Sequence, residues 1–447
     1  MRSLLKLFVP LAVFAVALVL LTSLNGGDGE TPVLADRPGP ASLDVGPNAT
    51  TQEAIDATLE AIETEPGDVA LQASLGDLYY QRGRETADAT FNAKALVAYE
   101  AALRLDPRNA GATLGLGTLA LAKHDFAGGL RWGQRALALE PASVAPYAAI
   151  VDAQVELGRY GDAKRSLQRM VGLKPNLASY SRISYFRELH GDLDGALEAL
   201  ELAASAGGGT AENVAYVETL LGNLQFQRGR IGAAELAHRA ALNRAPGFLN
   251  ARVGLATIAA SRGNLDAAID GYRRAIEVSA VHEFNVLLLE AQLAAGREAD
   301  AEQTKAEIRK YQAIERDQRG VDTDVELAIF EAEHGSPERA VELGRAAVAT
   351  APSAPAADAY SWALTHAGRG AEALRWGRRA LRLGSEDPLF LYHAGMAAKA
   401  AGEPALARRW LERALARNPR FSPWHAPRAR AALRALDAPR ARGDAGS

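Results

Sequence analysis

Small and hydrophobic residues recur at helical spacing in short Ala/Leu-rich segments, and prolines end these segments at a regular interval. Pro107, Pro141 and Pro175 lie 34 residues apart, and each follows such a segment. Between the prolines, a glycine-bearing turn interrupts the pattern, for example at Gly158 and Gly263. Because proline and glycine stop helices, each period predicts two short helices joined by a turn.

Small residues also occupy matching places within the periods. Gly76 precedes Tyr99 in the first period as Gly222 precedes His238 in the fifth. A glycine or alanine in mid-helix lets two helices approach closely, while the large residues fill the groove to the next pair. The pattern therefore predicts stacked helical hairpins rather than separate globular domains.

The period and these positions resemble the tetratricopeptide repeat family over residues 68–419. The resemblance implies an all-α, right-handed superhelical solenoid of about ten hairpins. Residues 52–67 and 420–436 are expected to be N- and C-terminal capping helices, and 437–447 a disordered tail. Prolines are missing near Ala280 and Ser385, and the fourth, seventh and ninth repeats match weakly, so their boundaries stay open.

The N-terminus is expected to be a membrane anchor or an export signal. Arg2 and Lys6 precede an apolar run over residues 7–21, and acidic residues follow it. Residues 1–24 are about long enough to span a bilayer, and residues 22–26 fit a cleavage site poorly, which favours an uncleaved single-pass anchor. Residues 25–51 are expected to be a flexible linker. The repeats would then lie outside the cytoplasm, or be secreted or periplasmic after cleavage.

Composition excludes several kinds of chemistry. The chain has no cysteine, so disulfides, thiolate metal sites and cysteine nucleophiles are excluded. A net charge of -4 gives no general attraction to nucleic acid. Arginine outnumbers lysine, as in bacterial proteins from GC-rich genomes.

No catalytic motif stands out, so we expect no enzyme activity, no cofactor and no small-molecule substrate. The enzyme alternative would need a site in the insert at residues 309–323, which lacks histidine and a Gly-rich loop. His124, His190, His334 and His366 fall near the predicted ends of first helices, where a cation is favoured by the helix dipole. A metal shared between these histidines is not expected, because packed helices lie about 8–10 Å apart.

In the resembling family, the first helix of each hairpin lines a concave face that binds peptides or protein surfaces. Acidic and aromatic residues predominate at the corresponding positions, which favours a basic or neutral, partly apolar protein or peptide partner. The lysine/asparagine clamp of the chaperone-tail-binding members is absent. The candidate partner-binding residues are Asp77, Tyr80, Asp152, Glu156, Tyr185, Glu188, Tyr216, Asn223, Phe226, Glu290, Trp362 and Tyr392.

Trp132 and Trp376 occupy equivalent places in two repeats, each followed by a glycine where the consensus has an aromatic residue. We interpret each tryptophan as a packing residue moved one position along the helix, with a docking spot as the alternative. Function is thus predicted as a non-catalytic protein-interaction scaffold displayed on the outer side of the membrane.

Overall fold

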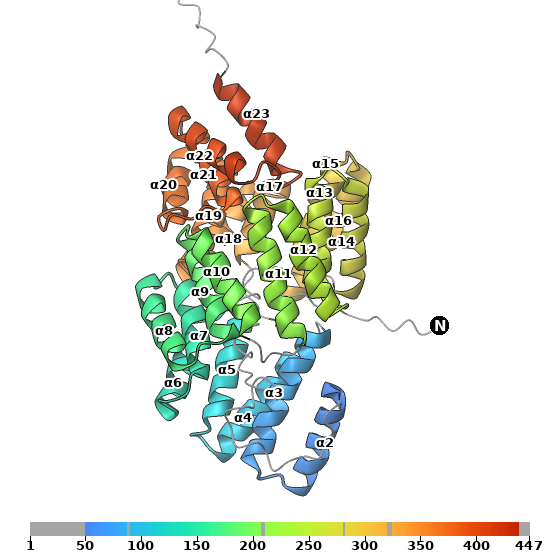
Figure 1. The fold of residues 1–447 in the computed structure, drawn as a ribbon, viewed down its shortest axis with the longest axis vertical. Helices are drawn as coiled ribbons and strands as arrows, with labels where there is room; N and C mark the ends of the chain where they lie inside the picture. Colours follow the sequence, from blue (N-terminus) through green and yellow to red (C-terminus); the bar gives the residue numbers. More distant parts are fainter. Residues whose placement is uncertain (1–49, 87–89, 207–210, 280–281, 320–323, 438–447) are drawn as a thin grey trace, which may run out of the picture.

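The computed structural model of the chain describes residues 50–86, 90–206, 211–279, 282–319 and 324–437, and within them it is helical without any strand (Figure 1). The helices are α2 (Thr51–Thr64), α3 (Val69–Thr86), α4 (Thr90–Leu105), α5 (Ala110–Ala122), α6 (Phe126–Leu139), α7 (Ala145–Glu156), α8 (Tyr160–Leu173), α9 (Leu177–Leu189), α10 (Leu193–Ser205), α11 (Ala211–Gln227), α12 (Ile231–Arg244), α13 (Leu249–Ser261), α14 (Leu265–Val278), α15 (His282–Ala294), α16 (Glu298–Arg319), α17 (Asp324–His334), α18 (Pro337–Thr350), α19 (Ala354–His366), α20 (Gly370–Ala380), α21 (Pro388–Ala400), α22 (Pro404–Arg417) and α23 (His425–Asp437).

These helices pair into ten hairpins, from α3/α4 to α21/α22, with α2 before and α23 after them. The prediction of an all-α superhelical solenoid is confirmed. The membrane anchor predicted over residues 1–24 lies outside the described residues. None of the described helices is both long and apolar enough to cross a bilayer.

The turns inside the hairpins follow from the sequence. Gly158, Gly191 and Gly263 end first helices with φ of 66°, 75° and 85°, a left-handed conformation that glycine adopts without strain. In the second hairpin His124 takes this place with φ of 59°. Asp125 then caps the next helix by accepting a 2.7 Å hydrogen bond from the Gly128 amide.

The hairpins pack through glycines that face large rings. The Tyr99 ring of α4 lies against Gly76 of α3 and Gly115 of α5, and a Cβ added at either glycine would collide with it. The His238 ring of α12 fits between Gly222 and Gly254 in the same way. The glycines and the large residues that recur in the sequence therefore pack against each other, each glycine leaving room for the ring that faces it.

First helices of neighbouring repeats contact each other, as in the α5/α7, α11/α13, α17/α19 and α19/α21 pairs. Comparable contacts between successive second helices are absent from the described part of the chain. The first helices are thus crowded on the inner side of the curve, and the second helices spread on the outer side.

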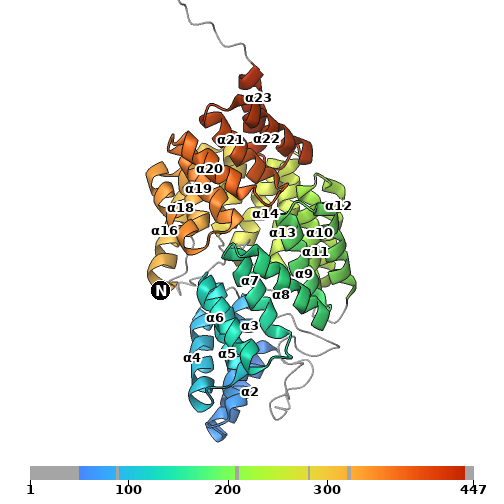
Figure 2. The same cartoon turned by 90° about the vertical axis from the view of Figure 1, so that its left-hand side faces the viewer.

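The solenoid curves until its C-terminal repeats lie against the middle ones (Figures 1 and 2). The Tyr160 hydroxyl accepts a 2.8 Å hydrogen bond from the Ala354 amide. Gln227 Nε2 donates to Asp387 Oδ2 at 2.8 Å, and Asn418 Nδ2 donates to the Phe226 carbonyl oxygen at 2.7 Å. These contacts join α8 and α11 to α19 and to the ends of α21 and α22, and they close one turn of the superhelix.

Candidate functional site

All twelve candidate partner-binding residues lie on first helices. They are distributed over α3 (Asp77, Tyr80), α7 (Asp152, Glu156), α9 (Tyr185, Glu188), α11 (Tyr216, Asn223, Phe226), α15 (Glu290), α19 (Trp362) and α21 (Tyr392). The structure therefore brings them to the inner side of the curve, but it does not gather them into one patch.

Most of these side chains are buried or partly buried. Tyr80, Tyr216, Trp362 and Tyr392 belong to the hydrophobic core, with exposed fractions of 7%, 5%, 2% and 1%. Asn223 is the exposed member of the set in the described chain. Because the closure of the superhelix covers the inner side, much of the predicted surface serves packing between repeats.

Asp152 is held inside the solenoid by Arg182 of α9. Arg182 Nε donates to Asp152 Oδ1 at 2.7 Å and Nη2 donates to Oδ2 at 2.8 Å, and both side chains are almost fully buried. Burial raises the pKa of Asp152 to about 6, although Arg182 acts to lower it. The Asp152 carboxylate is thus paired with Arg182 within the chain and is not presented to a partner protein.

Glu156 and Glu188 face the closure between the middle and the C-terminal repeats, near Ser353 and Asp387. Burial raises the pKa of Glu156 to about 7, against hydrogen bonds from Ser353 and Tyr185, while Asp152 and Glu326 raise it further. Burial also raises the pKa of Glu188 to about 7, against a hydrogen bond that Ser184 donates to it at 3.1 Å. Both carboxyl groups therefore titrate near neutrality.

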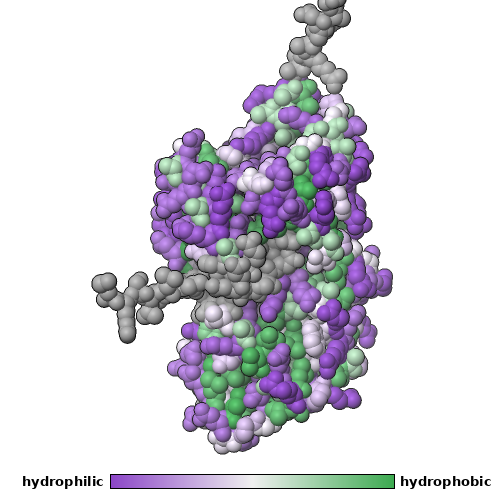
Figure 3. Space-filling view, turned by 180° about the vertical axis from the view of Figure 1, so that it is seen from behind, coloured by the Kyte–Doolittle hydropathy of each residue, from purple (hydrophilic) through white to green (hydrophobic). Residues whose placement is uncertain are grey.

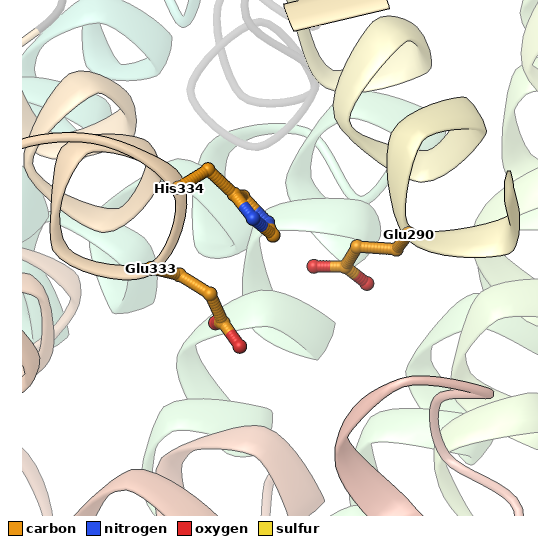
Figure 4. Close-up of side chains that lie close together, drawn as sticks. All are labelled: Glu290, Glu333 and His334. Carbon is orange, nitrogen blue, oxygen red and sulfur yellow. The ribbon is translucent and has the colours of Figure 1, made fainter. Parts of the chain in front are cut away.

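Glu290 belongs to a polar cluster at the ends of α15, α17 and α23. Glu333 Oε1 accepts a 2.6 Å hydrogen bond from Trp424 Nε1, and Glu333 Oε2 lies 2.8 Å from His425 Nε2. His425 Nδ1 lies 3.9 Å from Glu290 Oε2. His334 completes the cluster beside the two carboxylates (Figure 4).

The charges in this cluster are strongly coupled. Burial raises the pKa of Glu290 to about 7. Burial also acts to raise the pKa of Glu333, but the contact with His425 outweighs it and holds this pKa far below the usual value. Burial opposes protonation of His425, yet the two glutamates raise its pKa, whereas burial lowers the pKa of His334 to about 4.

A second buried acid–histidine pair lies next to this cluster. His393 Nδ1 of α21 is 2.7 Å from Asp358 Oδ2 of α19. The His393 ring stacks on Trp362, with centroids 4.2 Å apart. Trp362, predicted from the sequence to bind a partner, therefore packs against aromatic rings of α21 and α23 within the chain.

Sequence reasoning did not place Arg182, His393 or His425 in the site. A usable signal was present for two of them, because Asp152 and Arg182 are 30 residues apart and Asp358 and His393 are 35 apart. A separation of about one repeat places two residues on neighbouring first helices. His425 carries no such signal, since it begins the helix after the last repeat.

The two tryptophan positions act in packing. Trp132 and Trp376 are partly buried against the hydrophobic core, and the rings of Trp376 and Tyr360 lie 5.1 Å apart. The glycine after each lies close to the next first helix: a Cβ added at Gly133 would meet Ile150 at 3.0 Å. The packing interpretation accounts for both.

Residues 87–144, 149–210 and 219–280 match the tetratricopeptide repeat family. These three segments, which make up less than half of the chain, are similar to tetratricopeptide repeats. The matched segments correspond to α4–α14, which include Tyr99 with Gly115, and His238 with Gly222 and Gly254. Among curated proteins, none matches the chain.

Solved structures with similar helical arrays include TTC0263, a thermophilic TPR protein of Thermus thermophilus. It is 23% identical, with 43% of this chain and 98% of that chain covered and a TM-score of 0.38. YrrB, a TPR protein with an unusual peptide-binding site, is 21% identical over 44% of this chain and 96% of that chain, with a TM-score of 0.28. The human IFIT1 dimer with PPP-AAAA is 16% identical, with 82% of this chain and 86% of that chain covered and a TM-score of 0.46. These likenesses concern the fold alone.

Proposed function

We propose that the chain is a non-catalytic protein-interaction scaffold that binds a protein or peptide along its first helices. The observation that carries this proposal is the match of three segments to the tetratricopeptide repeat family, whose first helices line a concave face. Crowding of the first helices on the inner side of the curve supports the same face in this chain.

The charges and hydrophobic groups favour a partner that is basic or neutral and partly apolar. Asp77 and Glu188 add acidic groups to the inner side, and Tyr185 and Phe226 add partly buried aromatic rings. The exposed hydrophobic residues at the N-terminal end, Leu59, Val97 and Leu105, lie on α2 and on the second helix α4, outside the proposed face. Seen from the back, more hydrophobic surface lies toward this end than toward the C-terminal end (Figure 3).

Site-specific photo-crosslinking of the full chain in its native cells tests the proposal. A crosslinking amino acid replaces Asn223 or Lys399, which are exposed positions on first helices. Matched controls carry it at Leu236 and Val278, which are exposed positions on second helices. We expect one defined partner to be captured from both first-helix positions and not from the controls.

Equal capture from first and second helices, or capture from Val97 instead, would place the binding surface elsewhere on the solenoid. If none of the positions captures a partner, the scaffold proposal is wrong. Purified complexes, probed at low and high salt, would show whether acidic groups contribute, because screened charge pairs weaken as ionic strength rises.

Display on the outer side of the membrane is part of the same proposal. It rests on the charged start and apolar run of residues 1–24, which precede the described helices. Protease added to intact spheroplasts should digest the repeats, and N-terminal sequencing should find Met1 or Arg2 still in place. A mature N-terminus after residue 24 would instead indicate a secreted or periplasmic module.

A further inference from the structure

Three side chains at the junction of α15 and α17 are arranged as a set of metal ligands. Glu290 comes from α15, whereas Glu333 and His334 end α17. One ligand atom of each lies within 4.8 Å of those of the other two, and Figure 4 shows the three side chains extending into a common space.

Two of these groups lack a good partner within the described chain. His334 Nε2 is buried and has no hydrogen-bond partner there. The ion pair of Glu290 in the described chain is a long one, to His425 Nδ1 at 3.9 Å. A buried nitrogen without a hydrogen-bond partner and a partly buried carboxylate with only a long ion pair are groups that a bound cation would satisfy.

Glu333 already has the surroundings of a metal-binding carboxylate. Its two oxygens receive separate hydrogen bonds from Trp424 Nε1 and His425 Nε2, at 2.6 and 2.8 Å. Ser422 in turn lies 3.1 Å from His425 Nδ1 and fixes that ring. Carboxylates and imidazoles that bind metals are held by outer hydrogen bonds of this kind.

We propose that Glu290, Glu333 and His334 bind one divalent transition-metal ion, with Zn²⁺ as the probe, and leave a fourth position open. One imidazole nitrogen and two carboxylate oxygens suit Zn²⁺, whereas Mg²⁺ and Ca²⁺ prefer oxygen ligands throughout. In a tetrahedral site ligand atoms are about 3.4 Å apart. The three ligand atoms lie within 4.8 Å of one another here, so they would have to move closer together to reach that geometry.

The site would span a weak junction of the solenoid. Neighbouring helices contact each other closely along most of the array, but among the described residues, which leave out 320–323, few contacts join α16 and α17. Phe330 of α17 packs there with Leu289 and Ile308 in a small hydrophobic cluster. A metal ion held by α15 and α17 would cross-link the repeats on either side of this junction, and α23 would support it through Trp424 and His425.

The test uses the full chain, stripped with a chelator and titrated with Zn²⁺ in competition with a chromogenic chelator. We expect one ion per chain in the wild type and a loss of affinity of at least about tenfold in Glu290→Gln and in His334→Gln. The controls are Glu302→Gln, on the exposed side of α16, and His190→Gln on α9, which should both bind as the wild type does. Zn²⁺ should raise the unfolding temperature of the wild type and the controls but not of the two ligand variants.

Binding that is equally strong in the ligand variants, or no stoichiometric binding by the wild type, would overturn the proposal. X-ray absorption of the Zn²⁺-loaded wild type provides a check that needs no variant. It should show one imidazole and carboxylate oxygens at about 2.0–2.2 Å. A spectrum with two or more imidazoles would assign the ion to other residues and reject this site.

Discussion

Arg182 and Asp152 form a two-fold hydrogen-bonded ion pair that joins α9 to α7 inside the solenoid, with 0% and 2% of their side chains exposed. Arg182 also donates from Nη1 to the Ala178 carbonyl oxygen at 3.0 Å. A buried pair is stable only when both charges keep their partners, because an isolated buried charge is strongly unfavourable. The pair therefore ties the third repeat to the fourth.

We predict that Asp152→Leu lowers the free energy of unfolding by about 3–5 kcal/mol, because it leaves the Arg182 guanidinium buried without a counter-charge. The combined change of Asp152→Leu and Arg182→Met should be less destabilising than Asp152→Leu alone. Urea unfolding followed by circular dichroism measures both.

Asp162 provides the matched control for this pair. It lies on the exposed surface of α8, where it pairs with Arg159 at 2.6 Å. Asp162→Ala should change the unfolding free energy by at most about 1 kcal/mol, as exposed pairs do. Equal losses of unfolding free energy at Asp152 and Asp162 would show that burial does not increase the cost of breaking the Asp152–Arg182 pair.

Gly115→Ala is predicted to destabilise the chain by about 1–3 kcal/mol, because the added Cβ collides with the Tyr99 ring. Tyr99→Leu in the same chain should remove most of that penalty, even though it also removes the hydrogen bond from Tyr99 to Asp77. Gly172→Ala in α8 meets open space and should be neutral or stabilising by up to about 1 kcal/mol. Thermal and urea unfolding of the four chains decide this, and a neutral Gly115→Ala would refute the close-approach explanation.

The repeat and its internal packing could be predicted from the sequence, because they depend on short separations. The proline period, the turn glycines and the Gly76–Tyr99 relationship all act within one or two repeats. The closure of the superhelix could not be predicted from the sequence, because it joins residues as far apart as Tyr160 and Ala354. Its position depends on the small rotation between each repeat and the next, summed along the array, and no local pattern encodes that sum.

The same limit applies to the candidate site. The acidic and aromatic residues predicted for the inner side lie on first helices, but the sequence did not predict their partners within the chain. Asp152 is paired with Arg182, and Glu156 lies next to Ser353 from a distant repeat. Once the curve closes, an inward-facing charge meets the chain itself, so its accessibility depends on tertiary structure rather than on its place in the repeat.

Asn418→Ala is predicted to loosen the closure. Asn418 is 1% exposed and donates to the Phe226 carbonyl oxygen at 2.7 Å, so its loss removes a hydrogen bond across the closure, while that oxygen keeps the bond from the Gly229 amide. We expect destabilisation of about 0.5–1.5 kcal/mol and a larger radius of gyration in small-angle X-ray scattering. Asn264→Ala, which removes a cap within one hairpin, should lower stability without expanding the molecule. Expansion in both or in neither would mean that Asn418 does not maintain the closure.

Glu156 should lower the free energy of unfolding as pH rises. Its pKa is 4.5 in an unfolded chain and about 7 here, because burial disfavours the charged form. Below 4.5 the group is protonated in both states and has no effect. As pH rises from 4.5 to about 7 the unfolded chain loses the proton while the folded state keeps it, so the free energy of unfolding falls, by an amount on the order of 3 kcal/mol, and levels off above that range.

Glu156→Gln isolates this effect from that of the other titrating groups. The amide has nearly the same shape and no charge to lose, so the variant should match the wild type near pH 4.5 and exceed it in stability near pH 8. Glu302→Gln should show a difference of the opposite sign, because the hydrogen bond from Lys305 lowers the pKa of Glu302. If wild type and Glu156→Gln lose stability in parallel between pH 5 and 8, the Glu156 carboxyl is hydrated, and the closure does not exclude water from it.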